Sequence, residues 1–354
     1  MLIAGAVFVG ALVQLAPRSS AASIVAKVES PAPNKPTAER TPAGKASDLF
    51  CSKGYETICK SPPVADPTGE TSLDYRGEIR ALRILRRIVR SNPGWTTEQI
   101  ENELVQQIYT EPRKQNLIRI FETVRGQMLE YVHQQPARVF SDYDKSVLEQ
   151  RIRQVQLDLP VNRETYSDAT DLYTKSEIYY ESNNEGLMRI RVGGAYVLNT
   201  TSEFSIVFTM AHELAHAIDP CSLKSAQINY RAYDELVGCF VDSQWITREE
   251  AQCGNKDKTS EVFADWMGAE ILARSIKNRP NYSLQDKVNA SINAVRDLCD
   301  DSLGYEKVNL DYYPTDVIRV KSIFSKNGLL RKELQCAGTT APPAQPYCRF
   351  EMPR

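Results

Sequence analysis

The strongest constraint on the fold is an amphipathic helical segment that carries two of the chain's three histidines. Thr201 or Ser202 can cap the start of this segment, and Pro220 stops it. His212 and His216 are four residues apart, so both project from one helix face about one turn from each other. An apolar stripe on the same segment predicts that the helix is buried. This stripe consists of Phe204, Phe208, Ala211, Ala215 and Ile218.

The histidine spacing suits metal chemistry. Two imidazoles one turn apart can bind a single zinc ion at roughly 2.0–2.1 Å each. Glu213 lies beside them without being a ligand, and it can take a proton from a metal-bound water and pass it to a leaving amine. Because a bare HExxH pattern also arises by chance, the prediction depends on a third ligand elsewhere in the chain.

That third ligand is predicted in a second helical segment, KTSEVFADWMGAEILARS. Glu261 falls in its first turn and can complete a His2Glu zinc site, which leaves a fourth position for water or substrate. Asp265 follows one turn later on the same face and can accept a hydrogen bond from the far nitrogen of a zinc-bound imidazole. The small residues Ala264 and Gly268 would let the two helices pack closely.

The two acids also have a simpler explanation. Thr259 or Ser260 would cap the helix, and Glu261 would then be a charge favoured by the positive end of the helix dipole. Asp265 would be a solvated acid. The presence of HELAH upstream favours the ligand interpretation.

Together the two segments resemble the gluzincin metallopeptidases, whose pattern is HExxH followed by ExxAD. The resemblance is to the neprilysin-like family and to the CAAX prenyl endopeptidases with their soluble bacterial relatives. It covers about Met188–Cys336 and implies a zinc-dependent peptidase with one zinc ion per chain and a peptide or protein substrate. The matching residues are His212, Glu213, Leu214, Ala215, His216, then Glu261, Val262, Phe263, Ala264 and Asp265.

Both families carry a downstream His-Pro segment with an arginine six residues after the histidine, understood to bind substrate and stabilise the oxyanion. Here Tyr313 and Pro314 stand in that place, and Arg319 lies six residues after Tyr313. The resemblance therefore implies that Tyr313 and Arg319 support the tetrahedral intermediate, since a tyrosine hydroxyl can donate to an oxyanion. The tyrosine is a departure from the pattern. Tyr312 competes for the role, and a Tyr-Tyr-Pro turn packed on the core would explain the segment without catalysis.

A β-hairpin is predicted over residues 177–199, where β-branched and aromatic residues flank the turn signal SNNEG. Residues 188–198 would form its second strand. In gluzincins an edge strand upstream of HExxH pairs with the extended substrate, so the resemblance implies that Gly194, Ala195 and Tyr196 bind substrate by β-augmentation. A glycine pair also marks bulges in strands. The sequence has no GxMEN segment of the kind that holds a free N-terminus in gluzincin aminopeptidases, which favours an endopeptidase.

The overall prediction is an α+β, predominantly helical fold. A helical region over residues 71–160 precedes a zincin-like catalytic domain over residues 161–354, with a small antiparallel sheet before the HExxH helix. Thr96 and Gln99 form a possible capping box. A long helix is expected over residues 112–135, and this region could also cover the cleft as a pro-segment. Its inward residues would be Ile120, Val124 and Met128.

The first helix of this region is rich in arginine. Arg80, Arg83, Arg87 and Arg90 alternate with an apolar stripe, so the helix is either a membrane-surface element or a solvated face over a packed stripe. The formal net charge of -2 gives no reason to expect nucleic acid or an acidic membrane surface as a partner of the whole chain. The stripe comprises Tyr75, Ile79, Leu82 and Val89.

Export is predicted from the chain's start and from its cysteines. Residues 1–22 resemble a signal peptide, although no Lys or Arg precedes the apolar run, and residues 23–70 read as a Pro/Ala-rich linker. No stable membrane span is expected. Eight cysteines favour disulfides in a periplasmic or secreted protein. Expected roles are a local Cys51–Cys59 loop and a brace between the two metal-binding segments from Cys221, Cys239 and Cys253.

A different class of function fits the same residues. The fold could be retained as a binding or scaffold module with little catalysis, which would explain the missing downstream histidine.

Overall fold

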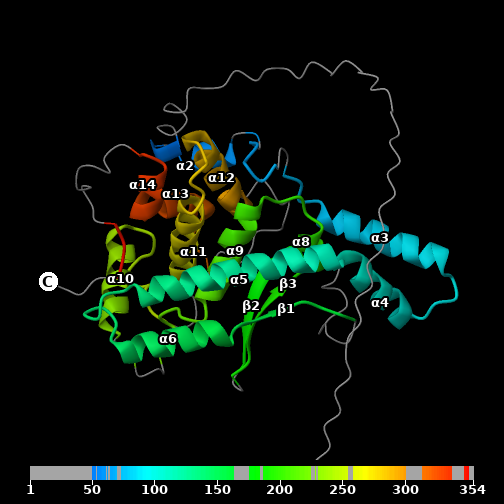
Figure 1. Cartoon of the computed structure of the whole chain (residues 1–354), viewed down its shortest axis with the longest axis horizontal. Coiled ribbons are helices and arrows are strands. Elements are labelled where there is room, and N and C mark those ends of the chain that lie inside the picture. Colours follow the sequence, from blue (N-terminus) through cyan, green and yellow to red (C-terminus); the bar gives the residue numbers. More distant parts are fainter. Residues whose placement is uncertain are drawn as a thin grey trace, which may run out of the picture. The chain divides into compact units, whose positions relative to one another are not determined.

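A computed structural model shows a mainly helical chain with one small sheet, which confirms the predominantly helical α+β class (Figure 1). The predicted signal peptide over residues 1–22 and most of the predicted linker lie outside the described residues. The structure describes residues 50–52, 54–60, 62, 64–69, 73–162, 175–183, 186–224, 228, 230–253, 258–299, 313–336 and 347–350.

The sheet has three strands in the order β1-β3-β2. The central strand β3 (Met188–Val192) pairs antiparallel with β2 (Ile178–Ser182), which confirms the predicted hairpin. β1 (Gln156–Asp158) pairs with β3 in the parallel direction. The predicted antiparallel sheet is therefore wrong for β1, because residues assigned to the helical region pair with β3 in the parallel direction.

β3 ends at Val192, six residues before the predicted end of the strand at residue 198. The chain turns at Gly193 into the short helix α8 (Gly194–Val197), and the Ala195 N–H donates to the carbonyl oxygen of Lys175. A Cβ on Gly193 would lie 2.2 Å from that same oxygen, so only glycine permits this close approach. The local turn replaces the strand although the sequence there is rich in β-forming residues.

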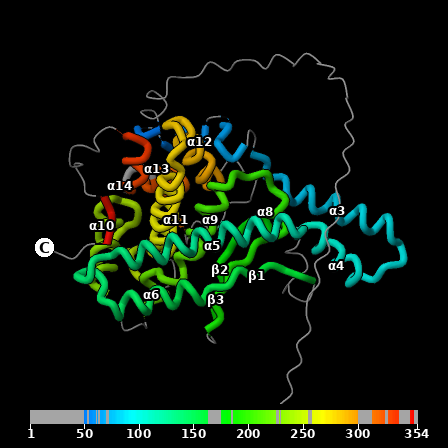
Figure 2. Tube along the Cα trace, in the orientation of Figure 1, coloured from blue at the N-terminus to red at the C-terminus, as the bar shows by residue number. Residues whose placement is uncertain are grey.

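Helices account for the rest of the described fold, and Figure 2 traces their path from α2 to α14. They are α2 (Gly54–Cys59), α3 (Gly77–Ser91), α4 (Thr97–Ile108), α5 (Glu111–His133), α6 (Asp142–Gln154), α9 (Glu203–Ala215), α10 (Arg231–Asp242), α11 (Thr259–Lys277), α12 (Leu284–Val295), the short 3-10 helix η2 (Arg296–Leu298), α13 (Asp316–Lys326) and α14 (Gly328–Glu333).

The largest hydrophobic core contains side chains of both the predicted helical region and the histidine helix. Buried side chains of α5 and α6 pack with those of the sheet, α9, α10 and α11. Ile120, Val124 and Met128 are all buried there, as predicted. Both predicted regions, 71–160 and 161–354, fall within one compact unit, Thr41–Arg354. A second core surrounds α12 and α13, and a third joins α3 to α4.

The apolar stripe predicted for α3 is wrong for two of its four residues, while Tyr75 and Leu82 are half-buried. Ile79 and Val89 are 47% and 44% exposed, whereas Ala81 and Ile88 are buried. The buried face is set by Gly77, which lies so close to α8 that a Cβ there would overlap the carbonyl oxygen of Ala195. The capping box that begins α4 is confirmed, with both the Thr96 and the Gln99 side chains engaged.

Four disulfides pair all eight cysteines. The predicted Cys51–Cys59 loop is wrong, because the segment that carries both residues packs against α12 and α13, where each thiol meets a distant partner. The predicted brace is confirmed for Cys221–Cys253, which spans the connection between the two metal-binding helices. The remaining pairs are Cys51–Cys336, Cys59–Cys299 and Cys239–Cys348.

This cysteine usage is typical of an extracellular or periplasmic protein. Among the residues that the structure describes, none of the helices combines the length and apolarity required to cross a bilayer.

Candidate metal centre

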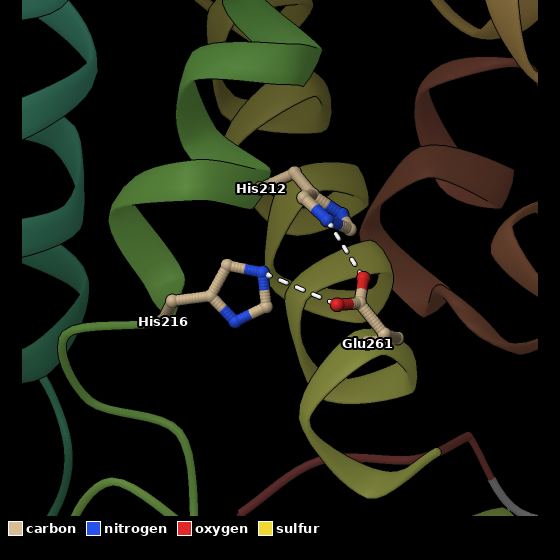
Figure 3. A group of neighbouring side chains, drawn as sticks. All are labelled: His212, His216 and Glu261. Carbon is tan, nitrogen blue, oxygen red and sulfur yellow. Dashed lines mark ion pairs between the residues drawn. The ribbon is translucent and has the colours of Figure 1, made fainter. Parts of the chain in front are cut away.

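Three side chains from two helices converge on one point (Figure 3). His212 lies in the last turn of α9, His216 caps that helix, and Glu261 lies in the first turn of α11. The Glu261 carboxylate is 3.1 Å from Nε2 of His212 and 3.8 Å from Nε2 of His216. Three ligands of one tetrahedral zinc ion would be roughly 3.3–3.4 Å apart. The group therefore has the size of a single cation site, and all its candidate ligand atoms lie within 4.8 Å of one another.

The two helices meet because their sequences permit a close approach. Ser202 begins α9 and accepts the Ser205 N–H, as predicted for one of the two candidate caps. A Cβ on Gly268 of α11 would lie 3.0 Å from the Phe208 ring, so glycine lets α11 pack tightly on α9. The predicted cap of α11 is wrong: Lys258 precedes the helix without a side-chain cap, and Thr259 is its first residue.

Asp265 contacts the ring nitrogen of His212 that faces away from Glu261. Its Oδ1 lies 3.0 Å from Nδ1 of His212, as the sequence predicted. Because the carboxylate is buried and accepts only, Nδ1 carries a proton and Nε2 is left facing Glu261. Glu261 Oε2 is itself buried, and the group that lies against it is Nε2 of His212. Nε2 of His212 and Oε2 of Glu261 thus face each other across 3.1 Å, a contact that either a proton on Nε2 or a cation between the two atoms would satisfy.

The pKa shifts of His212 and Glu261 also indicate that this pocket favours a positive charge. Burial lowers the pKa of His212, but hydrogen bonds to Asp265 and Glu261 outweigh burial and raise it to about 10. Burial alone would raise the pKa of the Glu261 carboxyl, whereas His212 and His216 bring it below its ordinary value. The pocket therefore favours a positive charge next to His212, either as a proton on Nε2 or as a metal ion.

Glu213 is held by a contact that the sequence did not reveal. Its Oε2 accepts the backbone N–H of Tyr180, at 2.8 Å, while its Oε1 lies 3.9 Å from Nε2 of His212. Burial raises the pKa of the Glu213 carboxyl. The Glu213 carboxylate is thus oriented by strand β2 and lies beside His212, a position from which a carboxylate can act as a general base.

Arg319 lies behind Asp265. Its Nε and Nη2 both donate to the Asp265 carboxylate, each at 2.8 Å, in a two-pronged contact. Burial would raise the pKa of Asp265, but Arg319 and His212 hold it well below its usual range. Arg319 was predicted to stabilise the intermediate directly. In the structure it instead binds Asp265, and Asp265 in turn contacts His212.

Tyr313 lies beside the centre. The Arg319 guanidinium is 5.0 Å from the centroid of the Tyr313 ring, within cation–π range. Burial together with the carboxylates of Glu261 and Glu213 raises the pKa of Tyr313, so its hydroxyl keeps its proton at neutral pH. Its competitor Tyr312 lies outside the described residues.

Asp219 is a second partner that the sequence analysis missed. Its Oδ2 lies 3.7 Å from Nδ1 of His216, and its carboxylate also accepts the backbone N–H groups of Cys221 and Ser222 and the hydroxyl of Ser260. The sequence held a signal for this contact, because Asp219 follows His216 by three residues, about one helical turn.

The prediction that Gly194, Ala195 and Tyr196 lie on a strand is wrong. All three lie in the buried helix α8, and β3 before them is the central strand, so they offer no edge to an extended ligand. The edge strand next to the centre is β2. The hydrogen-bonded pairs Glu177–Gly193 and Asn183–Leu187 flank it, so alternate residues direct their backbone groups outward. These residues are Ile178, Tyr180 and Ser182.

Comparison of the chain with protein-family models, with curated proteins and with solved structures finds no match.

Proposed function

We propose that this chain is a zinc-dependent endopeptidase with His212, His216 and Glu261 as its metal ligands. The observation that carries the proposal is the convergence of His212, His216 and Glu261, whose candidate ligand atoms all lie within 4.8 Å of one another, with Nε2 of His212 3.1 Å from Oε2 of Glu261. Two imidazoles and one carboxylate are the ligand set of catalytic zinc sites that keep a fourth position open. Zinc bound there would polarise the scissile carbonyl and activate a water molecule.

The chain's own residues supply the remaining chemistry. Glu213 takes the proton of the attacking water and returns it to the leaving amine. Asp265 keeps the proton on Nδ1 of His212, and Arg319 holds Asp265 in place. The protonated hydroxyl of Tyr313 donates to the developing oxyanion. An extended substrate pairs with the outward backbone groups of β2 other than the Tyr180 N–H, which Glu213 accepts, and this edge replaces the strand residues expected from the sequence.

The metal is tested by composition. Protein purified without chelator is expected to contain about one zinc ion per chain by elemental analysis, and His216→Ala, which removes a ligand, should weaken zinc binding at least tenfold. His133→Ala is the matched control, because the His133 side chain is 80% exposed and distant in sequence from the ligands. Wild-type protein that stays metal-free after dialysis against zinc would refute the site.

The reaction is tested by digestion of a peptide library with zinc-loaded protein. Internal cleavage that stops on chelation and returns with zinc supports the proposal. The replacement of the expected histidine by Tyr313 favours a second candidate, a binding module with little catalysis. Zinc binding without cleavage in the same assay would select that candidate.

Strand β2 is tested by Tyr180→Pro. The N–H of Tyr180 points away from β3, so proline removes only its bond to Glu213 and leaves the β2–β3 ladder intact. A hydrogen bond to a charged group contributes about 1.5–3 kcal/mol, so kcat/KM should fall roughly 10–100-fold below that of Tyr180→Ala, which loses the ring but keeps the N–H. Equal rates for the two variants, at equal zinc content, would show that this N–H does not orient the base.

A further inference from the structure

Helix α3 exposes a row of arginines that the proposed peptidase chemistry does not use. Arg83, Arg86 and Arg90 recur at the spacing of one helix face, and all three are exposed. Ile79 begins the same row, one turn before Arg83. Figure 1 shows α3 beyond α8, on the side away from α11, so this face is distinct from the metal centre.

These arginines differ from the others on the surface. On α5 and α6, Arg119, Arg125 and Arg153 each form an ion pair with a glutamate. Within the described part of the chain, no hydrogen bond or ion pair is formed by Arg83, Arg86 or Arg90. Their neighbours on α3 are already engaged: Arg80 pairs with Asp74, and Arg87 donates to Gln107. The row is therefore a positive surface without internal compensation, although the net charge of the chain is -2.

Apolar side chains are interspersed with the arginines. Ile79, Val89 and Trp95 are 47%, 44% and 38% exposed, the last in the turn that follows α3. Nucleic-acid surfaces would leave the aliphatic side chains without a partner, whereas a phospholipid headgroup layer accommodates both kinds. Guanidinium groups bind phosphate in a two-pronged manner, and an indole is favoured at the level of the headgroups.

We propose that the exposed face of α3 docks the protein on a membrane surface rich in anionic phospholipids. The contact is peripheral: arginines bind headgroup phosphates, while Ile79, Val89 and Trp95 insert shallowly. Such a surface would hold the metal centre near membrane-associated substrates, which extends the proposed function without depending on it.

The experiment measures co-sedimentation of the full chain with vesicles of phosphatidylcholine alone or mixed with phosphatidylglycerol. Each arginine at such a surface changes partitioning roughly fivefold, so the triple variant Arg83→Gln/Arg86→Gln/Arg90→Gln should bind the anionic vesicles on the order of 100-fold more weakly than wild type. Raising the ionic strength should reduce wild-type binding. The matched control is Arg119→Gln/Arg125→Gln/Arg153→Gln, which removes the same charge and should bind at least tenfold more tightly than the α3 variant.

The residues that precede α3 are identical in all these variants. Any membrane affinity of the N-terminal segment is therefore the same in each protein and cannot cause a difference in vesicle binding between them. Equal binding of wild type and the α3 variant, or equal binding of wild type to neutral and anionic vesicles, would overturn the proposal. So would tighter binding of wild type to a random-sequence oligonucleotide than to anionic vesicles, because that result would assign the arginine row to nucleic acid. Circular dichroism of each variant excludes loss of the helix as the cause.

Discussion

Glu213→Gln is expected to lower peptide hydrolysis by about 10²–10⁴-fold while leaving the zinc content unchanged. The magnitude is that of losing general acid–base catalysis at one positioned side chain. Glutamine keeps the shape of the side chain, and its amide oxygen can still accept the Tyr180 N–H. It cannot take a proton from water. The variant therefore separates proton transfer from the architecture of the centre.

The measurement is kcat/KM on a peptide cleaved by wild type, with zinc determined in the same samples. Glu122→Gln is the control, because Glu122 is an exposed residue of α5 paired with Arg125, and its loss should leave the rate within twofold. Wild-type rates in Glu213→Gln would remove Glu213 from the mechanism even if zinc were present. A joint loss of zinc and activity would instead mean that Glu213 helps to hold the metal.

The residues of the centre could be predicted because they are set by helical periodicity. His212 and His216 share a face of one helix, Glu261 and Asp265 share a face of another, and both relations follow from spacing alone. The small residue at Gly268 indicated where the two helices approach, and a Cβ there would lie 3.0 Å from the Phe208 ring. Local patterns of this kind survive in any tertiary context that keeps the helices.

The remaining features depend on long-range contacts that spacing does not encode. The end of β3 is set by the carbonyl of Lys175, which bonds to Ala195 across the hairpin and overrides the β-forming composition. The partners of Cys51 and Cys59 lie 285 and 240 residues away in sequence. The bond from Tyr180 to Glu213 uses a backbone group, which carries no sequence signal at all.

The role of Arg319 illustrates both cases. Its distance from Tyr313 in sequence indicated that it belongs to the centre, and the guanidinium does lie against the Tyr313 ring. Its main contact, however, is the two-pronged bond to Asp265, a residue on another helix. A family pattern thus located the residue, while the packing of α13 against α11 decides which group it binds.

Arg319→Met is expected to destabilise the protein by about 3–5 kcal/mol, the cost of leaving one partner of a buried ion pair uncompensated. The Asp265 side chain is 3% exposed, and its ionised form is maintained mainly by Arg319. Methionine fills much of the space of the arginine stem without supplying a charge. The measurement is urea unfolding with chelator in every sample, so that differences in zinc affinity do not enter.

Two further variants decide what the loss means. Arg279→Met breaks a surface pair with Glu203 and should cost no more than about 1 kcal/mol. The double variant Asp265→Asn/Arg319→Met removes the buried charge but keeps an acceptor for Nδ1 of His212, so it should recover a large part of the stability lost in Arg319→Met. If the double variant is as unstable as the sum of its single variants, Arg319 stabilises the fold through its own packing. In that case the carboxylate that orients His212 does not depend on it.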